Sequence, residues 1–373
     1  PIHSKSYEQN HIQMPGPRSV YVHIPFCLHR CGYCNFTLVA GRDHLIDDYL
    51  QALEIEMSQV EGRPAVDTIY LGGGTPSWLP TPSLRFLLRL LEQRFDFASS
   101  GEFTMEANPD DLPGDISSVI ADSPINRISL GVQSFHQQKL KSLDRDHNEV
   151  QIEAALDNIR QIADRFSIDL IFAAPHDSPE IWQSDLNRGV ASGATHISTY
   201  ELTYEKGTQF WNRQHHGDLH PVNDEQCAAY YESTIELLAS TGFEHYEISS
   251  FARDGHRSRH NQVYWSGQSY FGFGPGASGL IGNVRYTNHR SVTRYLKNVL
   301  LGESAIEDSQ SLTPHELALD RLVFGLRMID GVNCIQFAED TGLQVQELVP
   351  SRLMDEWTKQ DLIQTDNDRL KLT

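Results

Sequence analysis

The feature that most constrains the fold is a regular alternation of apolar, β-rich runs with amphipathic stretches between about residues 18 and 205. Six runs have the length and composition of buried strands: Ser19–Phe26, Thr68–Gly72, Glu102–Ala107, Arg127–Val132, Ser167–Ala173 and His196–Leu202. The intervening stretches have helical periodicity, as in Asp43–Val60, Pro82–Phe95, Glu149–Arg165 and Pro179–Ala191. This alternation predicts an α/β fold with a parallel sheet. Because six units fall short of the eight in a closed barrel, we expect a partial (β/α)6 barrel.

Glycine or polar residues occur in the last part of most of these predicted strands. They are Gly72–Thr75, Glu106, Gln133, Asp169 and Glu201. Ligands bind parallel α/β sheets at the carboxyl ends of the strands, so we expect these residues to share one site. Any one of them taken alone also suits a helix cap.

The pattern changes after Thr208 and suggests further domains. Trp211–His220 is polar and is expected to be a loop, whereas Asn223–Thr241 is expected to be a capped helix. Thr313 and Glu316 form a capping-box start, and the tail is predicted to hold two short helices and a hairpin that turns at Asp366–Asp368. The expected division is a flexible lead-in at 1–18, the barrel at 19–208, an extension at 209–310 and a helical, winged-helix-like C-terminal domain at 311–373.

The charge and cysteine content exclude several classes of protein. The chain has 30 Lys and Arg against 50 Asp and Glu, a net charge of −20, which disfavours nucleic acid as a partner. No apolar run approaches the ~18 residues that span a bilayer, and the N-terminus lacks a secretory signal. Five cysteines in 373 residues are not a disulfide framework. We therefore expect a cytoplasmic protein.

Three of the five cysteines form a C-x₃-C-x₂-C motif at Cys27, Cys31 and Cys34, just after the first predicted strand. Structural zinc is one alternative, but it requires a fourth ligand, such as His23 or His29. Buried free cysteines are another, although they rarely cluster in this way. A [4Fe–4S] cluster normally takes four thiolates, so three would leave one iron open to a small molecule.

This cysteine loop resembles the signature of the radical S-adenosylmethionine superfamily. The resemblance implies that the open iron binds the methionine part of S-adenosylmethionine, and that an electron supplied to the cluster cleaves the sulfonium. The Gly-rich turn Gly72–Pro76 resembles the element that holds the methionine amino group in that superfamily. Glu106 and Gln133, at the ends of the next two strands, resemble its further contacts with this cofactor.

Further sequence motifs resemble those of a narrower group, the oxygen-independent coproporphyrinogen III oxidases and their relatives, the haem chaperones of the HemW type. These motifs contain Cys27, Gly73, Glu106 and Gln133, in that order along the chain. The resemblance covers the chain from about residue 19 onward. By this similarity the cofactor contacts are Tyr21, Tyr33, Gly72, Gly73, Gly74, Thr75, Glu106, Gln133, Arg145, Asp169 and Glu201. Arg145 and Asp169 also suit a structural ion pair or helix caps.

Two features separate the chaperones from the oxidases. The oxidases carry a fourth cysteine where this chain has Phe36, and a longer segment before the motif than the 26 residues that precede Cys27 here. The word from His260 to Trp265 resembles the H-N-x-x-Y-W element of the haem chaperones. His260 is therefore a candidate haem contact. The alternative is a hydrogen-bonded histidine under a domain junction, with Tyr264 and Trp265 in the core.

The resemblance implies a haem chaperone that carries a [4Fe–4S] cluster with S-adenosylmethionine and delivers haem, its cargo, to membrane-bound acceptor proteins. Such a protein needs an electron donor, and a homodimer is a family-level expectation. The alternative is an oxygen-independent coproporphyrinogen III oxidase, which removes carboxyl groups from propionates by radical chemistry. Phe36 weighs against that enzyme. Radical chemistry on an unrelated substrate is a third reading.

Overall fold

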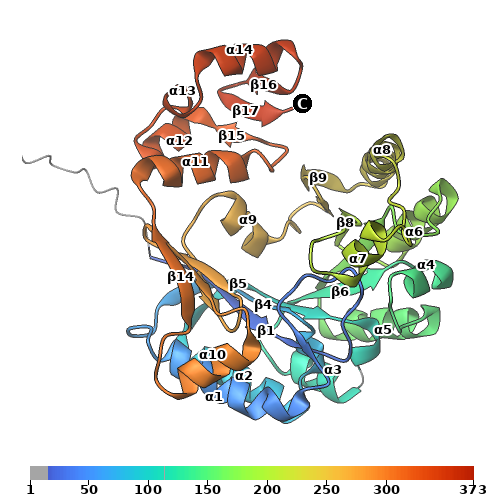
Figure 1. The fold of residues 1–373 in the computed structure, drawn as a ribbon, viewed down its shortest axis with the longest axis vertical. Helices are drawn as coiled ribbons and strands as arrows, with labels where there is room; N and C mark the ends of the chain where they lie inside the picture. The colour runs from blue at the N-terminus through green and yellow to red at the C-terminus, as the bar shows by residue number, and fades with distance from the viewer. Residues whose placement is uncertain (1–15, 113) are drawn as a thin grey trace, which may run out of the picture.

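The computed structural model describes residues 16–112 and 114–373, and its largest sheet has nine strands in the order β11-β1-β4-β5-β6-β7-β8-β10-β9 (Figure 1). Six consecutive members of this sheet run parallel: β1 (Ser19–Ile24), β4 (Ala65–Gly73), β5 (Asp96–Ala107), β6 (Arg127–Gln133), β7 (Arg165–Phe172) and β8 (His196–Glu201). The edges are β11 (Phe271–Phe273), parallel to β1, and the antiparallel pair β10 (Ser250–Ala252) and β9 (Glu244–Glu247). The six-unit parallel α/β arrangement expected from the sequence is confirmed.

Helices between the parallel strands cover the outer face of the sheet (Figure 1). They are α1 (Ile46–Met57), α2 (Thr81–Arg94), α3 (Gly114–Ala121), α4 (Gln137–Ser142), α5 (Glu149–Ile162) and α6 (Pro179–Ala191). Each longer helix buries one apolar stripe; in α2 this stripe contains Leu84, Leu87 and Leu91. The sheet and these helices share one hydrophobic core.

The register brings the carboxyl ends of the strands to one edge of the sheet. Ile24, the last residue of β1, is opposite Gly73, the last residue of β4. The chain then passes from β1 into a small parallel pair, β2 (Phe26–Cys27) with β3 (Val39–Ala40). The cysteine loop therefore lies at the same edge as the glycine-rich turn. Three short 3₁₀ helices follow strands β3, β4 and β5 in the chain: η1 (Asp43–Leu45), η2 (Pro76–Trp78) and η3 (Pro109–Asp111).

The segment after β8 contains three helices that the sequence interpretation missed, namely α7 (Gln209–His215), α9 (Arg259–Trp265, within 243–286, which was expected to form short strands and tight turns) and α10 (Val292–Leu300). Residues expected to form a loop at Trp211–His220 instead form the helix α7, because the hydroxyl of Thr208 accepts a hydrogen bond from the amide of Trp211. The expected helix is present as α8 (Asp224–Ser240), capped by Asn223. It is followed by α9, α10 and a second sheet of β12 (Ser278–Ile281), β13 (Val284–Asn288) and β14 (Ile306–Ser311).

The C-terminal part has a hydrophobic core of its own. It begins with α11 (Pro314–Gly325), whose capping box of Thr313 and Glu316 is present as expected. Three short helices follow where two were expected, because 345–348 forms an extra turn, and β17 joins the predicted hairpin to a third short strand. The remaining elements are β15 (Val332–Asn333), α12 (Cys334–Thr341), α13 (Val345–Leu348), α14 (Ser351–Lys359), β16 (Ile363–Asp366) and β17 (Arg369–Leu372).

The expected domain boundaries stay predictions, and residues 1–15 of the expected lead-in lie outside the described residues. Among the residues that the structure describes, we find no helix with the length and apolar character needed to cross a membrane.

Candidate functional site

A cavity of about 840 Å³ opens at the carboxyl edge of the parallel strands. Such a volume is typical of small-molecule and cofactor sites. Its walls contain twelve of the fifteen residues proposed from the sequence: Cys27, Cys31, Cys34, Tyr33, Gly73, Gly74, Thr75, Glu106, Gln133, Arg145, Asp169 and Glu201. The remaining three, Tyr21, Gly72 and His260, do not line it.

The three cysteines line the cavity and have different surroundings. The Sγ atom of Cys27 lies 3.2 Å from the hydroxyl of Thr75, and burial raises the pKa of this thiol to about 12. Burial also raises the pKa of Cys34. At Cys31, burial is outweighed by the His29 ring and the Arg145 guanidinium, each 3.6 Å from Sγ, and the net effect lowers the pKa of the thiol.

The donor set fits an iron–sulfur cluster better than a single zinc ion. In residues 16–112 and 114–373, no three His, Cys, Asp or Glu side chains gather around one ion-sized point. Three thiols that line one cavity without converging on a single ion suit a cluster, whose iron atoms are separate ligation points. Arg145 and His29 add positive charge beside Cys31, which suits an anionic cluster of thiolate ligands.

The glycine-rich turn is built for close contact between β4 and the cysteine loop. Gly73 has φ +113°, and a Cβ atom there would lie 2.5 Å from the His23 ring. A Cβ atom at Gly74 would lie 2.7 Å from the Phe26 carbonyl oxygen and 3.0 Å from Sγ of Cys27. Any side chain would therefore push the turn away from the cysteine, and only glycine tolerates the backbone conformation at 73 without strain.

Glu106 ends β5 with its carboxylate fixed at both oxygens. One oxygen accepts a 2.8 Å hydrogen bond from the Tyr70 hydroxyl, and the other accepts a 3.0 Å bond from the amide of Gly73. Burial raises the pKa of Glu106 to about 7, although both hydrogen bonds oppose the shift. Gly72 lies behind this carboxylate, since a Cβ atom there would be 3.0 Å from Oε1 of Glu106. Gly72 therefore acts by leaving room for the acid.

Arg145 bridges the cysteine loop and the strand ends. Its Nη2 donates to Oδ1 of Asn108 at 2.6 Å and to the carbonyl oxygen of Gly131 at 3.0 Å. Asn108 in turn donates to the Thr75 hydroxyl at 3.0 Å. The partners are neutral groups and the Cys31 thiol, so the alternative of a structural ion pair does not describe Arg145. The sequence interpretation did not propose Asn108 as a site residue, although it lies in the same motif as Glu106, two residues further along the chain.

Gln133 and Asp169 occupy the next two strand ends. Gln133 has φ +64°, a conformation uncommon for a residue with a side chain, and it lines the cavity. Asp169 accepts a 3.2 Å hydrogen bond from Ser129, and burial raises the pKa of its carboxyl. Strained backbone and a buried acid are features that concentrate at functional sites.

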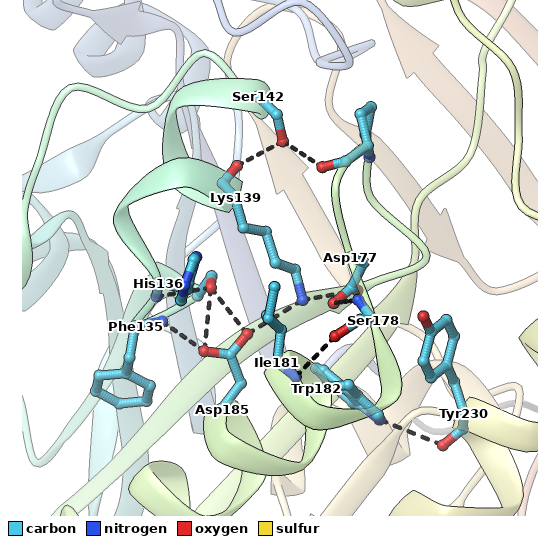
Figure 2. Close-up of polar contacts among 12 residues, drawn as sticks. Phe135, His136, Lys139, Ser142, Asp177, Ser178, Ile181, Trp182, Asp185 and Tyr230 are labelled. Atoms are coloured by element: carbon cyan, nitrogen blue, oxygen red, sulfur yellow. Dashed lines mark hydrogen bonds and ion pairs between the residues drawn. The ribbon is translucent and has the colours of Figure 1, made fainter.

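A buried ionic network holds the turn that follows Gln133 (Figure 2). Nζ of Lys139, on α4, lies 2.8 Å from a carboxylate oxygen of Asp177 and 3.1 Å from one of Asp185. Asp185 also accepts hydrogen bonds from the Ser134 hydroxyl, at 2.8 and 3.0 Å. The network thus connects α4 and α6 directly beside the cavity wall, and nothing in the sequence indicated it.

The cysteine loop is also held from outside the cavity by residues that sequence reasoning missed. Oδ2 of Asp144 accepts a 3.1 Å bond from the amide of Gly32, and the carbonyl oxygen of Gly32 accepts a 2.9 Å bond from the amide of Phe210. A Cβ atom at Gly32 would lie 2.4 Å from both Asp144 and the Phe210 ring. These contacts join distant segments, so no local pattern could have revealed them.

Two of the candidates outside the cavity lie in the interior of the barrel. The hydroxyl of Tyr21 lies 2.9 Å from Nδ1 of His23. His260 is 0% exposed; its Nδ1 lies 2.8 Å from the Thr68 hydroxyl and its Nε2 lies 2.7 Å from the Tyr264 hydroxyl. Burial lowers its pKa to about 3. Both ring nitrogens are engaged within the protein, as in the alternative of a buried, hydrogen-bonded histidine, and the contact of His260 with haem stays a prediction.

Comparison with known families agrees with this geometry. Residues 21–187 match the radical SAM superfamily, and residues 312–373 match the HemN C-terminal domain. The fold is similar to that of coproporphyrinogen III oxidase (HemN) from Escherichia coli, described as a radical SAM enzyme. The TM-score is 0.84 at 23% identity, over 96% of this chain and 87% of that one.

Curated relatives match over nearly the whole chain. One, from Lactococcus lactis, is 36% identical over 96% of this chain and 93% of its own length. Another, from Bacillus subtilis, is 36% identical over 91% of this chain and 90% of its own length. Both are named "Heme chaperone HemW". With its parallel barrel, its cysteine-lined cavity and its HemN C-terminal domain, the chain belongs to the HemW family of the radical SAM superfamily.

Proposed function

We propose that the protein is a haem chaperone that binds haem and delivers it to acceptor proteins. The observation that carries the proposal is the match over about nine tenths of the length of two relatives named as haem chaperones. Membrane-bound haem proteins are the acceptors implied by the sequence resemblance, and the protein would meet them from the cytoplasm. A homodimer and an electron donor complete the proposal.

The cofactors of the proposal are a [4Fe–4S] cluster and S-adenosylmethionine. Cys27, Cys31 and Cys34 would hold the cluster, and bound S-adenosylmethionine can supply a carbon radical when its sulfonium is cleaved by one electron. The cofactor contacts implied by the resemblance line the same cavity, except for Tyr21 and Gly72. The Arg145 guanidinium would balance negative charge beside Cys31, and the Glu106 carboxylate would face the cationic sulfonium compound.

The second candidate function is coproporphyrinogen III oxidation, which we consider because the fold is similar to that of HemN. Phe36 argues against it. This side chain is 64% exposed at the cavity rim, at the position where the oxidases carry a fourth cysteine. An exposed phenyl ring cannot supply a thiol, but it offers an apolar surface that a macrocycle can contact.

The test compares both functions on one preparation, reconstituted with iron and sulfide without oxygen. Haem titration, followed by the absorbance of the bound porphyrin, should saturate at a fixed ratio of haem to protein. The loaded protein should then pass haem to a haem-free acceptor faster than haem exchanges from buffer. Conversion of coproporphyrinogen III by the reduced protein with S-adenosylmethionine, without saturable haem binding, would replace the chaperone by the oxidase.

A further inference from the structure

We propose that helix α9 supports the S-adenosylmethionine site from behind the cavity wall, where His260 and Tyr70 are positioning residues that hold the Glu106 carboxylate. This inference rests on the S-adenosylmethionine binding in the proposed function and is independent of haem. It assigns the motif from His260 to Trp265 a role, and this role needs no contact between His260 and haem.

The first step is the anchoring of α9 inside the barrel. The two carboxylate oxygens of Glu102, on β5, accept hydrogen bonds from the amides of Arg259 and His260, at 3.1 and 3.0 Å. Glu102 is 2% exposed. The helix N-terminus carries free amides and partial positive charge, so a buried carboxylate there fixes the start of the helix. His260 is therefore placed by its backbone as well as by its ring.

The second step is the contact between His260 and β4. The rings of His260 and Tyr70 stack with their centroids 5.1 Å apart and an interplanar angle of 30°. Hydrogen bonds to Thr68 and Tyr264 restrain the imidazole at both nitrogens, at 2.8 and 2.7 Å. A side chain held at both ends of its ring gives Tyr70 a rigid surface to lie on.

The third step carries this rigidity to the cavity wall. The Tyr70 hydroxyl donates to Oε1 of Glu106, and Oε2 accepts from the amide of Gly73, so the carboxylate has one orientation. Glu106 lines the cavity, whereas Tyr70 and His260 lie behind it. Other charged or titratable groups that act on Glu106 or respond to it come from β1, β6, β7, β8 and α9: Tyr21, Arg127, Asp169, Tyr200 and Tyr264.

The same helix contacts the C-terminal domain. Figure 1 shows α9 between the central sheet and α11, and α9 packs against both β4 and α11. The Arg327 guanidinium, just after α11, lies 4.4 Å from the centre of the Trp265 ring. A continuous set of contacts thus runs from the HemN C-terminal domain through Trp265 and His260 to Glu106.

The test measures S-adenosylmethionine affinity in Tyr70→Phe, which keeps the ring and deletes the hydroxyl. Equilibrium dialysis on reconstituted protein between pH 6 and 8.5 gives the dissociation constant. We expect affinity to fall about tenfold, the effect of one hydrogen bond to a charged group. The Tyr70 hydroxyl lowers the pKa of Glu106, so its loss should move the pH midpoint of binding upward.

Tyr295→Phe is the matched control, because Tyr295 donates a 2.6 Å hydrogen bond to Glu56, another buried carboxylate, away from the cavity. It should keep the wild-type affinity and pH midpoint. In a Glu106→Gln background, Tyr70→Phe should have little further effect, as expected for residues that act through one another. His260→Phe should weaken binding in the same direction and serves as the second variant if Tyr70→Phe folds poorly.

Two outcomes would overturn the inference. One is an unchanged affinity and pH midpoint in Tyr70→Phe and His260→Phe. The other is a loss of affinity that is equally large in the Glu106→Gln background, which would indicate a general structural defect. If the wild-type protein binds no S-adenosylmethionine, the inference and the cofactor part of the proposed function fail together. If it binds S-adenosylmethionine but not haem, the chaperone proposal alone fails.

Discussion

Replacing Lys139 with methionine removes the only cation that an ion pair supplies to the buried carboxylates of Asp177 and Asp185 among the described residues (Figure 2). The side chains of Lys139 and Asp177 are 0% exposed, and that of Asp185 is 1% exposed. Methionine has a similar length and fills the space, so the change isolates the charge. The two acids then remain in a medium that solvates them poorly.

The expected cost follows from this burial. Breaking a buried ion pair by removing one partner costs about 3–5 kcal/mol. That range corresponds to roughly two to four powers of ten in the folding equilibrium. Part of the strain can be relieved by protonation, since burial already raises the pKa of Asp177. The deficit of Lys139→Met should therefore be larger at pH 8 than at pH 5, where an unpaired acid gains a proton.

The assay is urea unfolding of each variant at both pH values, followed by circular dichroism and by tryptophan fluorescence. One of the five tryptophans, Trp182, has its ring 4.9 Å from Nζ of Lys139. Lys141→Met is the control, because Lys141 is exposed on the same helix and its loss should change stability by under about 0.5 kcal/mol. Adding Asp177→Asn to Lys139→Met should recover part of the loss. Equal urea midpoints for the two single variants at pH 8 would refute the reasoning.

Three further predictions concern the site and its surroundings. Cys31→Ala should lower the iron bound after reconstitution and abolish the cluster absorbance; a full cluster spectrum would contradict the assignment. Gly73→Ala should weaken S-adenosylmethionine binding at least tenfold in dialysis, because the Cβ atom meets His23 and φ is +113°. Burial lowers the pKa of His147 to about 4, so stability should fall as pH drops from 6.5 toward 4. His147→Gln, which keeps a donor for the Val132 carbonyl, should flatten that fall in urea midpoints.

Much of the barrel was predictable because its signals are local. Helix α6 begins at Pro179 and ends at Ala191, as its periodicity predicted, and Thr313 caps the helix that it was expected to cap. Of the two caps expected for α8, Asp224 or Asn223, the structure has Asn223. Helix α7 was missed because it is short and polar, and its start depends on one Thr208 hydroxyl. Periodicity needs several turns to register, so a helix of this length leaves little signal.

The site was predictable to the extent that its residues come from strand ends and a cysteine motif. Glu106, Gln133 and Asp169 were expected to meet, since parallel strands end at one edge, and all three line the cavity. The partners that orient them were not predictable. Asn108 and Asp144 make their contacts with residues over 30 positions away, and such pairings depend on the packed arrangement of the whole barrel.

The sequence by itself determined the six strand–helix units of the barrel, the close spacing of the three cysteines and the family resemblance. Periodicity, glycine content and cysteine spacing are patterns within a few residues, so they can be recognised in the sequence alone. Only the tertiary structure decided the place of His260. The resemblance of its motif to the haem chaperones marked it as a candidate haem contact, whereas the fold packs its ring, from α9, against β4 with both ring nitrogens engaged. The burial of a side chain and its hydrogen bonds depend on residues that can be distant in sequence. Thr68, which contacts the His260 ring, lies 192 positions before it.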